Sequence, residues 1–76
     1  MEEKLKMADY IAKAPIRRLM KRQGANLVAA DALDRLIEFL ENVAAETTEK
    51  AIKVTKADKR KRITEADIRD ASRIWY

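Results

Sequence analysis

The sequence predicts an all-α fold, and three observations point to this class. Glycine and proline occur only once each among the 76 residues, so long stretches contain no helix-breaking residue. Apolar residues, 47% of the chain, recur at steps of three and four positions, which is the spacing of one face of a helix. Charged residues make up 39% and fill the positions between them. This composition argues against a strand-rich, fibrous or disordered protein.

A first short helix is expected from near Pro15 to Gly24. Proline is favoured at the opening position of a helix, and the only glycine of the chain fits the left-handed residue that follows one. Ile16, Leu19 and Met20 fall on one side of this helix. Residues 1–12 are predicted to be an N-terminal extension whose apolar spacing allows another helical turn or two, and residues 13–76 form the main domain.

A long helix is expected from residue 30 or 31 to residue 57, because this stretch contains neither glycine nor proline. About 27 residues at roughly 1.5 Å each make a rod of about 40 Å. Short flanking helices cannot cover an apolar stripe of that length, and the chain has neither Cys nor His for a disulfide or a zinc site. A second copy of the chain is therefore expected to cover it. The stripe comprises Leu33, Leu36, Ile37, Leu40, Val43, Ala44, Ala51 and Val54, widened by Phe39 and Ile52.

A last helix is expected from about Glu65 to Trp75. Thr64, with Asp67 three residues later, is a helix-start signal. Four consecutive cations, Lys59 to Arg62, lead directly into this signal, so the basic loop belongs to the fold and is not a disordered tail.

Charge is divided along the chain, although the net charge is only +4. Residues 13–22 hold five cations and no acid, residues 50–62 hold seven cations and one acid, and residues 31–49 hold six acids and one cation. The basic ends are therefore expected to face a polyanion such as a phosphate backbone. Arg60 can reach Asp67 and is predicted to form a structural ion pair, whereas Lys61 and Arg62 are predicted to contact phosphate. Two further lysines are expected to pair along the long helix, as Glu46–Lys50 and Glu49–Lys53.

Catalytic, metal-binding and membrane functions are not supported by the sequence. Nucleophile–base pairs built on His or Cys are excluded, and a single glycine excludes a glycine-rich phosphate-binding loop. The carboxylates are spread at helical surface spacings and do not converge on a metal site. No apolar run approaches the roughly 20 residues of a membrane span, and the N-terminus lacks a signal-peptide core. We therefore expect a cytoplasmic protein that is not an enzyme and uses no cofactor, metal or small-molecule substrate.

Four segments, in this order, resemble archaeal histones: Pro15-Ile16-x-Arg18-x-x-Lys21, Gly24-Ala25, Val28-x-x-Asp31-Ala32 and Arg60-Lys61-x-Ile63-x-x-x-Asp67-Ile68. The similarity covers about residues 14–75. It implies a histone fold in residues 13–76, with a short, a long and a short helix, that forms a head-to-tail handshake dimer. In the family, the arginine equivalent to Arg18 enters the minor groove, and the loop cations grip phosphates on either side.

The resemblance and the charge pattern together assign the residues to roles. The DNA-binding set is Lys13, Arg17, Arg18, Lys21, Lys61, Arg62 and Thr64. The dimer interface is Leu33, Leu36, Ile37, Leu40, Val43, Ala44 and Ile52. The region expected to join one dimer to the next is Val54, Ala57, Asp67 and Asp70.

The chain departs from the family pattern at several of these positions. Arg17 stands where a small residue is usual, Leu27 where a cation is frequent and Arg62 where a threonine is common, so the DNA contacts are expected to be redistributed. Ala57 replaces a usual histidine and Asp70 a usual leucine in the region that joins dimers. Because two Asp70 carboxylates near a two-fold axis would repel each other, we expect weak stacking of dimers.

The expected function is sequence-independent binding, bending and compaction of double-stranded DNA in the nucleoid by a homodimer. Phosphate contacts carry no base code, and minor-groove arginines read width and deformability. The alternatives are a histone-fold transcription-factor subunit that acts in a heterodimer, and a helical interaction module whose partner is an acidic protein. A nuclear-targeting role for the basic run 59–62 would require a eukaryotic source.

Overall fold

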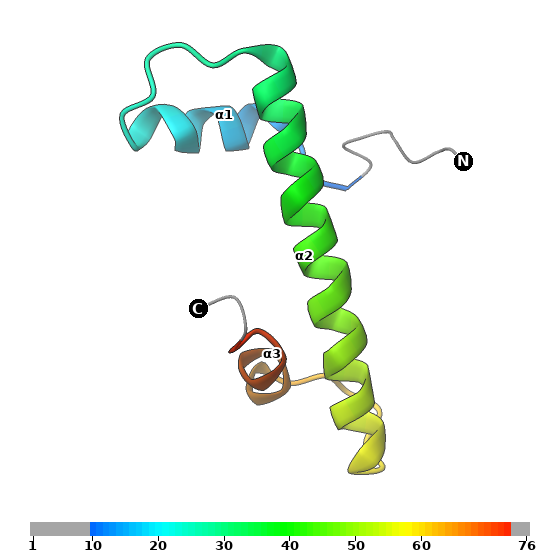
Figure 1. The fold of residues 1–76 in the computed structure, drawn as a ribbon. Coiled ribbons are helices and arrows are strands. Elements are labelled where there is room, and N and C mark those ends of the chain that lie inside the picture. Colours follow the sequence, from blue (N-terminus) through cyan, green and yellow to red (C-terminus); the bar gives the residue numbers. More distant parts are fainter. Residues whose placement is uncertain (1–9, 74–76) are drawn as a thin grey trace, which may run out of the picture. The chain divides into compact units, whose positions relative to one another are not determined.

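The structure, a computed structural model, describes residues 10–73, which form three helices and no strand (Figure 1). Helix α1 spans Lys13–Arg22, helix α2 spans Ala30–Ala57 and helix α3 spans Glu65–Ala71. The prediction of an all-α chain with a short, a long and a short helix is confirmed. Most of the predicted N-terminal extension, together with Trp75, lies outside the described residues. The chain divides into two compact units after Asn42, which is a residue of α2.

Helix α1 begins two residues before the start predicted at Pro15. The first N–H groups of a helix have no acceptor within it, so a proline at the third position removes no hydrogen bond. The end of α1 agrees with the prediction, since Gly24 has a φ of 113°, in the left-handed region that favours glycine. The Gly24 N–H donates to the Lys21 carbonyl at 3.0 Å. The Ala25 N–H donates to the Met20 carbonyl at 3.1 Å, which completes a Schellman motif.

Helix α2 ends with the same motif, but a lysine occupies the left-handed position. Lys59 has a φ of 60°, and its N–H donates to the Lys56 carbonyl at 2.8 Å. The Arg60 N–H donates to the Thr55 carbonyl at 3.0 Å. A left-handed conformation costs a residue with a side chain roughly 1–2 kcal/mol. The chain therefore closes α2 with backbone strain that a glycine would avoid.

Helix α3 starts as predicted and ends earlier. The Thr64 hydroxyl accepts a hydrogen bond from the Asp67 N–H at 3.4 Å, and the Asp67 carboxylate accepts one from the Thr64 N–H at 3.0 Å. This reciprocal capping box fixes the first turn. The helix ends at Ala71 and not near residue 75. The Ser72 hydroxyl donates to the Arg69 carbonyl at 3.3 Å, and such side-chain bonds compete with continuation of a helix.

The unit that contains α1 has a small core. Leu33 and Ile37 of α2 are fully buried, whereas α1 contributes no buried residue. Ile16 and Met20 are half-buried, and Leu19, which the pattern placed beside them, is 51% exposed. Much apolar surface of α1 therefore remains accessible in a single chain.

The unit that contains α3 is built around short side chains. Thr47, Ala51 and Thr55 are buried and recur at four-residue steps, which places them on one face of α2. Asp67 and Ala71 of α3 are buried as well. Across residues 10–73, the large side chains with complete burial are therefore confined to the two apolar residues of the first unit, and a single chain holds little core.

Candidate nucleic-acid interface

Helix α1 carries a dense set of cations that its own chain does not neutralise. Arg18, Lys21 and Arg22 are exposed, and Arg17 is half-buried. Within residues 10–73, no acidic side chain lies within ion-pair distance of these four cations. The helix also has no acidic residue in its first turn. This surface is therefore positively charged and accessible to a polyanion.

Lys13, which the charge pattern grouped with these cations, is engaged by an acid of α2. Its Nζ lies 2.9 Å from Asp34 Oδ1. The backbone N–H groups of Tyr10 and Ile11 both donate to Glu41 Oε2, each at 2.9 Å. Two acids of α2 thus hold the segment that leads into α1, whose own N-cap residue forms no side-chain hydrogen bond. Lys13 is consequently a weaker candidate for phosphate contact than the other cations of α1.

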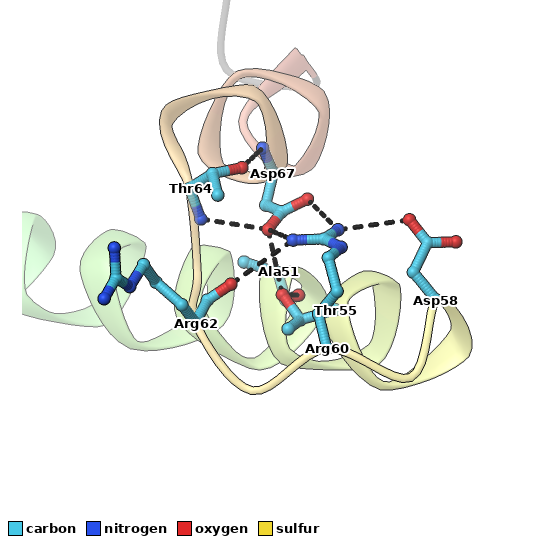
Figure 2. Close-up of polar contacts among 7 residues, drawn as sticks. All are labelled: Ala51, Thr55, Asp58, Arg60, Arg62, Thr64 and Asp67. Carbon is cyan, nitrogen blue, oxygen red and sulfur yellow. Dashed lines mark hydrogen bonds and ion pairs between the residues drawn. The ribbon is translucent and has the colours of Figure 1, made fainter.

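The loop between α2 and α3 is fixed by Arg60 (Figure 2). Its Nη2 donates to Asp67 Oδ1 at 2.9 Å and its Nη1 donates to Asp67 Oδ2 at 3.1 Å, a bidentate arrangement. The same guanidinium donates to Asp58 Oδ2 at 3.1 Å and to the Arg62 carbonyl at 3.3 Å. The arginine–aspartate pair expected from the sequence is present, and it connects the start of the loop to the first turn of α3.

Asp67 is the central acceptor of this network, with a side chain only 5% exposed. Besides the two bonds from Arg60, it accepts the Thr64 N–H at 3.0 Å and the Thr55 hydroxyl at 3.0 Å. The Thr55 hydroxyl also lies 2.9 Å from the Ala51 carbonyl, so its hydrogen is shared between two acceptors. The guanidinium and the backbone N–H hold the pKa of Asp67 well below its ordinary value. The carboxylate in turn raises the pKa of Arg60, so the pair is charged at neutral pH.

The remaining cations of the loop lie outside this network. Lys61 and Arg62 are exposed and have no acidic partner among the described residues, and the Arg62 side chain extends away from Arg60 in Figure 2. Lys59 is also exposed and unpaired within residues 10–73, although no sequence pattern assigned it a role of its own. Thr64 uses its hydroxyl and N–H in the capping box and remains exposed.

The predicted dimer-interface residues differ in exposure. Leu33 and Ile37 have 0% exposure, so the single chain already buries both side chains. Their place in a dimer interface stays a prediction. The other members keep accessible surface in the single chain, namely Leu36, Leu40, Val43, Ala44 and Ile52.

One residue of the predicted dimer–dimer region, Asp67, is buried in the single chain. Its carboxylate accepts hydrogen bonds from donors of its own chain. Asp70 is exposed and lies 3.3 Å from Arg73, one turn further along. Val54 and Ala57 of α2 are exposed.

Three residues of α2 make contacts that were not anticipated, and two expected ion pairs are not formed. Asp34, Glu41 and Thr55 bind groups between 12 and 31 positions away. The seven-residue spacing of the two acids, which puts them on one helix face, was the available signal. The expected ion pairs Glu46–Lys50 and Glu49–Lys53 do not form, because the charged groups are too far apart. Both lysines are exposed to solvent.

The part of the chain that the structure describes contains neither a candidate metal site nor a candidate membrane span. It contains no group of three or more acidic residues placed to hold a metal ion. None of its helices combines the length and the apolar composition needed to cross a membrane.

Comparison with known proteins identifies a family and a relative of the chain. The model of the family described as histone-like transcription factor (CBF/NF-Y) and archaeal histone matches residues 10–71. The chain is 39% identical over 56 residues to a subunit of the archaeal histone HAN1 from Thermococcus zilligii, a match that covers 74% of this chain and 84% of the relative. The family match includes all three helices and the basic loop.

Proposed function

The chain belongs to the family of histone-like transcription factors and archaeal histones, and from this membership we propose that it binds double-stranded DNA independently of base sequence, bends it and compacts it. The family consists of structural DNA-binding proteins and not of enzymes. We assign the histone-fold domain to residues 13–76 and place the protein on the chromosome, in the nucleoid of the cytoplasm.

The observation that carries this proposal is a division of roles between acids and cations. Asp34, Glu41 and Asp67 bind groups of their own unit and hold the start of α1 and the basic loop. Among the described residues, the charges left without partners on α1 and in the loop are all positive. An excess of arginine and lysine attracts phosphates through Coulomb forces and counterion release, and phosphates carry no base code.

We propose that the active form is a homodimer. Leu36, Leu40 and Val43 are incompletely covered in a single chain, and Leu19 is 51% exposed. Burying such surface is worth about 25 cal/mol per Å². A second chain crossing α2, as in the histone handshake, would cover these residues and place two sets of α1 cations on one particle.

Further stacking of dimers is proposed to be weak. Two Asp70 carboxylates brought near a symmetry axis would repel each other, and the exposed ion pair with Arg73 offsets this only in part. The alternative active form is a heterodimer with a different histone-fold chain. The relative from Thermococcus zilligii, which is itself named as a subunit, keeps this alternative open to test.

The test is a salt titration of unrelated duplexes with the purified protein, with the mass of the complex measured at each step. If Arg17, Arg18, Lys21, Lys61 and Arg62 of both chains each contact a phosphate, about ten contacts give a slope of about −9 in log K against log salt. A nearly flat plot would refute DNA binding through these cations. A smallest complex that holds two copies of this chain supports the homodimer, whereas binding that requires a second kind of chain supports the heterodimer.

A further inference from the structure

Lys59 occupies a backbone position that disfavours any residue with a side chain. Its φ of 60° lies in the left-handed region, where the side chain crowds the following carbonyl. Gly24 holds the corresponding place after α1, with a φ of 113°. The chain therefore uses the same helix-ending motif twice, and only the second copy is strained.

The rest of the described chain gives no structural reason for this lysine. The side chain is exposed and forms no hydrogen bond or ion pair with any of residues 10–73. Lys56 already stands in the last turn of α2, where a cation offsets the negative end of the helix dipole. Packing, pairing and the dipole therefore leave the strain unexplained. Strain that is retained in a regular motif is characteristic of functional positions.

The backbone around Lys59 is held in place before any ligand arrives. The Lys59 N–H is bonded to the Lys56 carbonyl at 2.8 Å, and the next side chain, Arg60, is bonded to both Asp58 and Asp67. The two loop cations already assigned to phosphate follow immediately. All three exposed cations thus lie within four consecutive residues, which span at most about 10 Å of chain. A fixed backbone loses little conformational entropy on binding, so each cation contributes more of its attraction to affinity.

We propose that Lys59 is a third phosphate-binding cation of the loop, beside Lys61 and Arg62. The proposal rests on the DNA-binding function proposed above. The ligand is the phosphate backbone of double-stranded DNA, so Lys59 raises the affinity for every duplex and does not change base preference. A glycine here would relieve the strain and lose this contact.

The Lys59→Gly variant tests the proposal because it moves stability and binding in opposite directions. We expect the melting temperature of the free protein to rise by about 4–8 °C, which corresponds to about 1 kcal/mol of relieved strain. At about 0.15 M salt, the affinity for an unrelated duplex should fall on the order of 10-fold to 30-fold, and the slope should become shallower by about 2, one contact from each chain. Lys59→Arg, which keeps the charge and the strain, should retain the wild-type slope. Lys53→Ala, which removes an exposed cation of α2 that is unpaired within residues 10–73, is the matched charge control and should retain it as well.

Each outcome of this experiment bears on the proposal. A wild-type slope in Lys59→Gly, with steep binding by the wild-type protein, would overturn the role of Lys59 and leave the proposed function intact. A nearly flat plot for the wild-type protein would overturn both. An equally shallow slope of log K against log salt in Lys53→Ala would show that the effect comes from net charge alone. A lower melting temperature in Lys59→Gly would show that Lys59 stabilises the fold. Either of these last results contradicts the proposal.

Discussion

The substitution Leu40→Ala measures whether one chain is only half of a folding unit. Leu40 is half-buried within a single chain, whereas Ile37, one turn earlier on α2, is fully buried. Truncating a fully buried Leu or Ile to Ala costs about 2–5 kcal/mol, and a half-buried one costs less because part of the surface is already in water. For an isolated chain we therefore expect a loss of about 1 kcal/mol at Leu40. If a partner covers Leu40, the loss should rise to about 3 kcal/mol per chain.

If the partner is a second copy, as proposed, the dimer contains two copies of each substitution and the effect on association is doubled. Two losses of about 3 kcal/mol amount to about 6 kcal/mol per dimer, which raises the dissociation constant on the order of ten-thousand-fold at about 1.4 kcal/mol per factor of ten. Ile37→Ala serves as the benchmark for complete burial. The two variants should therefore destabilise the protein to a similar extent, although their exposure in a single chain differs.

The assay is thermal unfolding at several protein concentrations, combined with sedimentation of the native state. For a folded dimer in equilibrium with unfolded chains, the wild-type melting temperature should rise with concentration. Leu40→Ala should lower it at every concentration. The reasoning is refuted if the wild-type protein is a compact monomer with a concentration-independent melting temperature and Leu40→Ala remains within about 1 kcal/mol of it.

Three further predictions concern contacts within one chain. Because the pKa of Asp67 is depressed in the folded state, the folded protein binds fewer protons than the unfolded chain below pH ~4, so the stability from Asp67 should be complete above that pH and should decline on acidification. Melting temperatures measured from about pH 6 to about pH 2 should therefore change less for Asp67→Asn than for the wild type. Equal profiles for the two proteins would contradict this. Thr47→Val should raise the free energy of unfolding by about 1 kcal/mol, because the Thr47 hydroxyl is buried without a hydrogen-bond partner among the described residues. The exposed control Thr48→Val should change the free energy of unfolding little. A loss of stability in urea titration of Thr47→Val would disprove this account. Glu41→Ala should lower the free energy of unfolding by about 1–2 kcal/mol, because it removes the acceptor of two backbone N–H groups. Glu38→Ala breaks only an exposed ion pair and should lower it by less than about 0.5 kcal/mol. Equal losses in the two variants would show that the hydrogen bonds to Glu41 do not contribute more than a surface ion pair.

The features that the sequence predicted correctly depend on residues close together in the chain. Local backbone geometry accounts for Gly24 after α1 and for the capping box of Thr64 and Asp67. The end of α2 at Ala57 was also predicted, although the residue that closes the helix was not. Arg60 and Asp67 are seven positions apart in the chain. Their bond could be predicted because the helix start at Thr64 placed Asp67 in the first turn of the last helix. Local rules therefore sufficed for the helices and for the centre of the loop.

The features that the sequence did not predict depend on tertiary contacts or on backbone strain. The bonds from Tyr10 and Ile11 to Glu41 join groups 31 and 30 positions apart. The spacing of Asp34 and Glu41 indicates that both acids share a helix face, but it does not specify their partners. Helix-ending rules favour glycine at a left-handed residue, so they provided no reason to place Lys59 there. Proline is compatible with the whole first turn of a helix, which is why Pro15 indicated the start of α1 only to within two residues.

The acidic middle of the chain and its basic ends are parts of one mechanism. Five cations between residues 13 and 22 repel one another, and this repulsion opposes the ordering of α1. Asp34 and Glu41 counter it by binding the segment that leads into α1, and they do so without neutralising Arg18 or Lys21. In the basic loop, one cation of the four, Arg60, is committed to Asp67, so that its neighbours are presented by a fixed backbone. Because these acids act on the scaffold and not on the proposed binding surface, their loss should weaken binding to all duplexes equally. Loss of an exposed cation should also reduce the salt dependence.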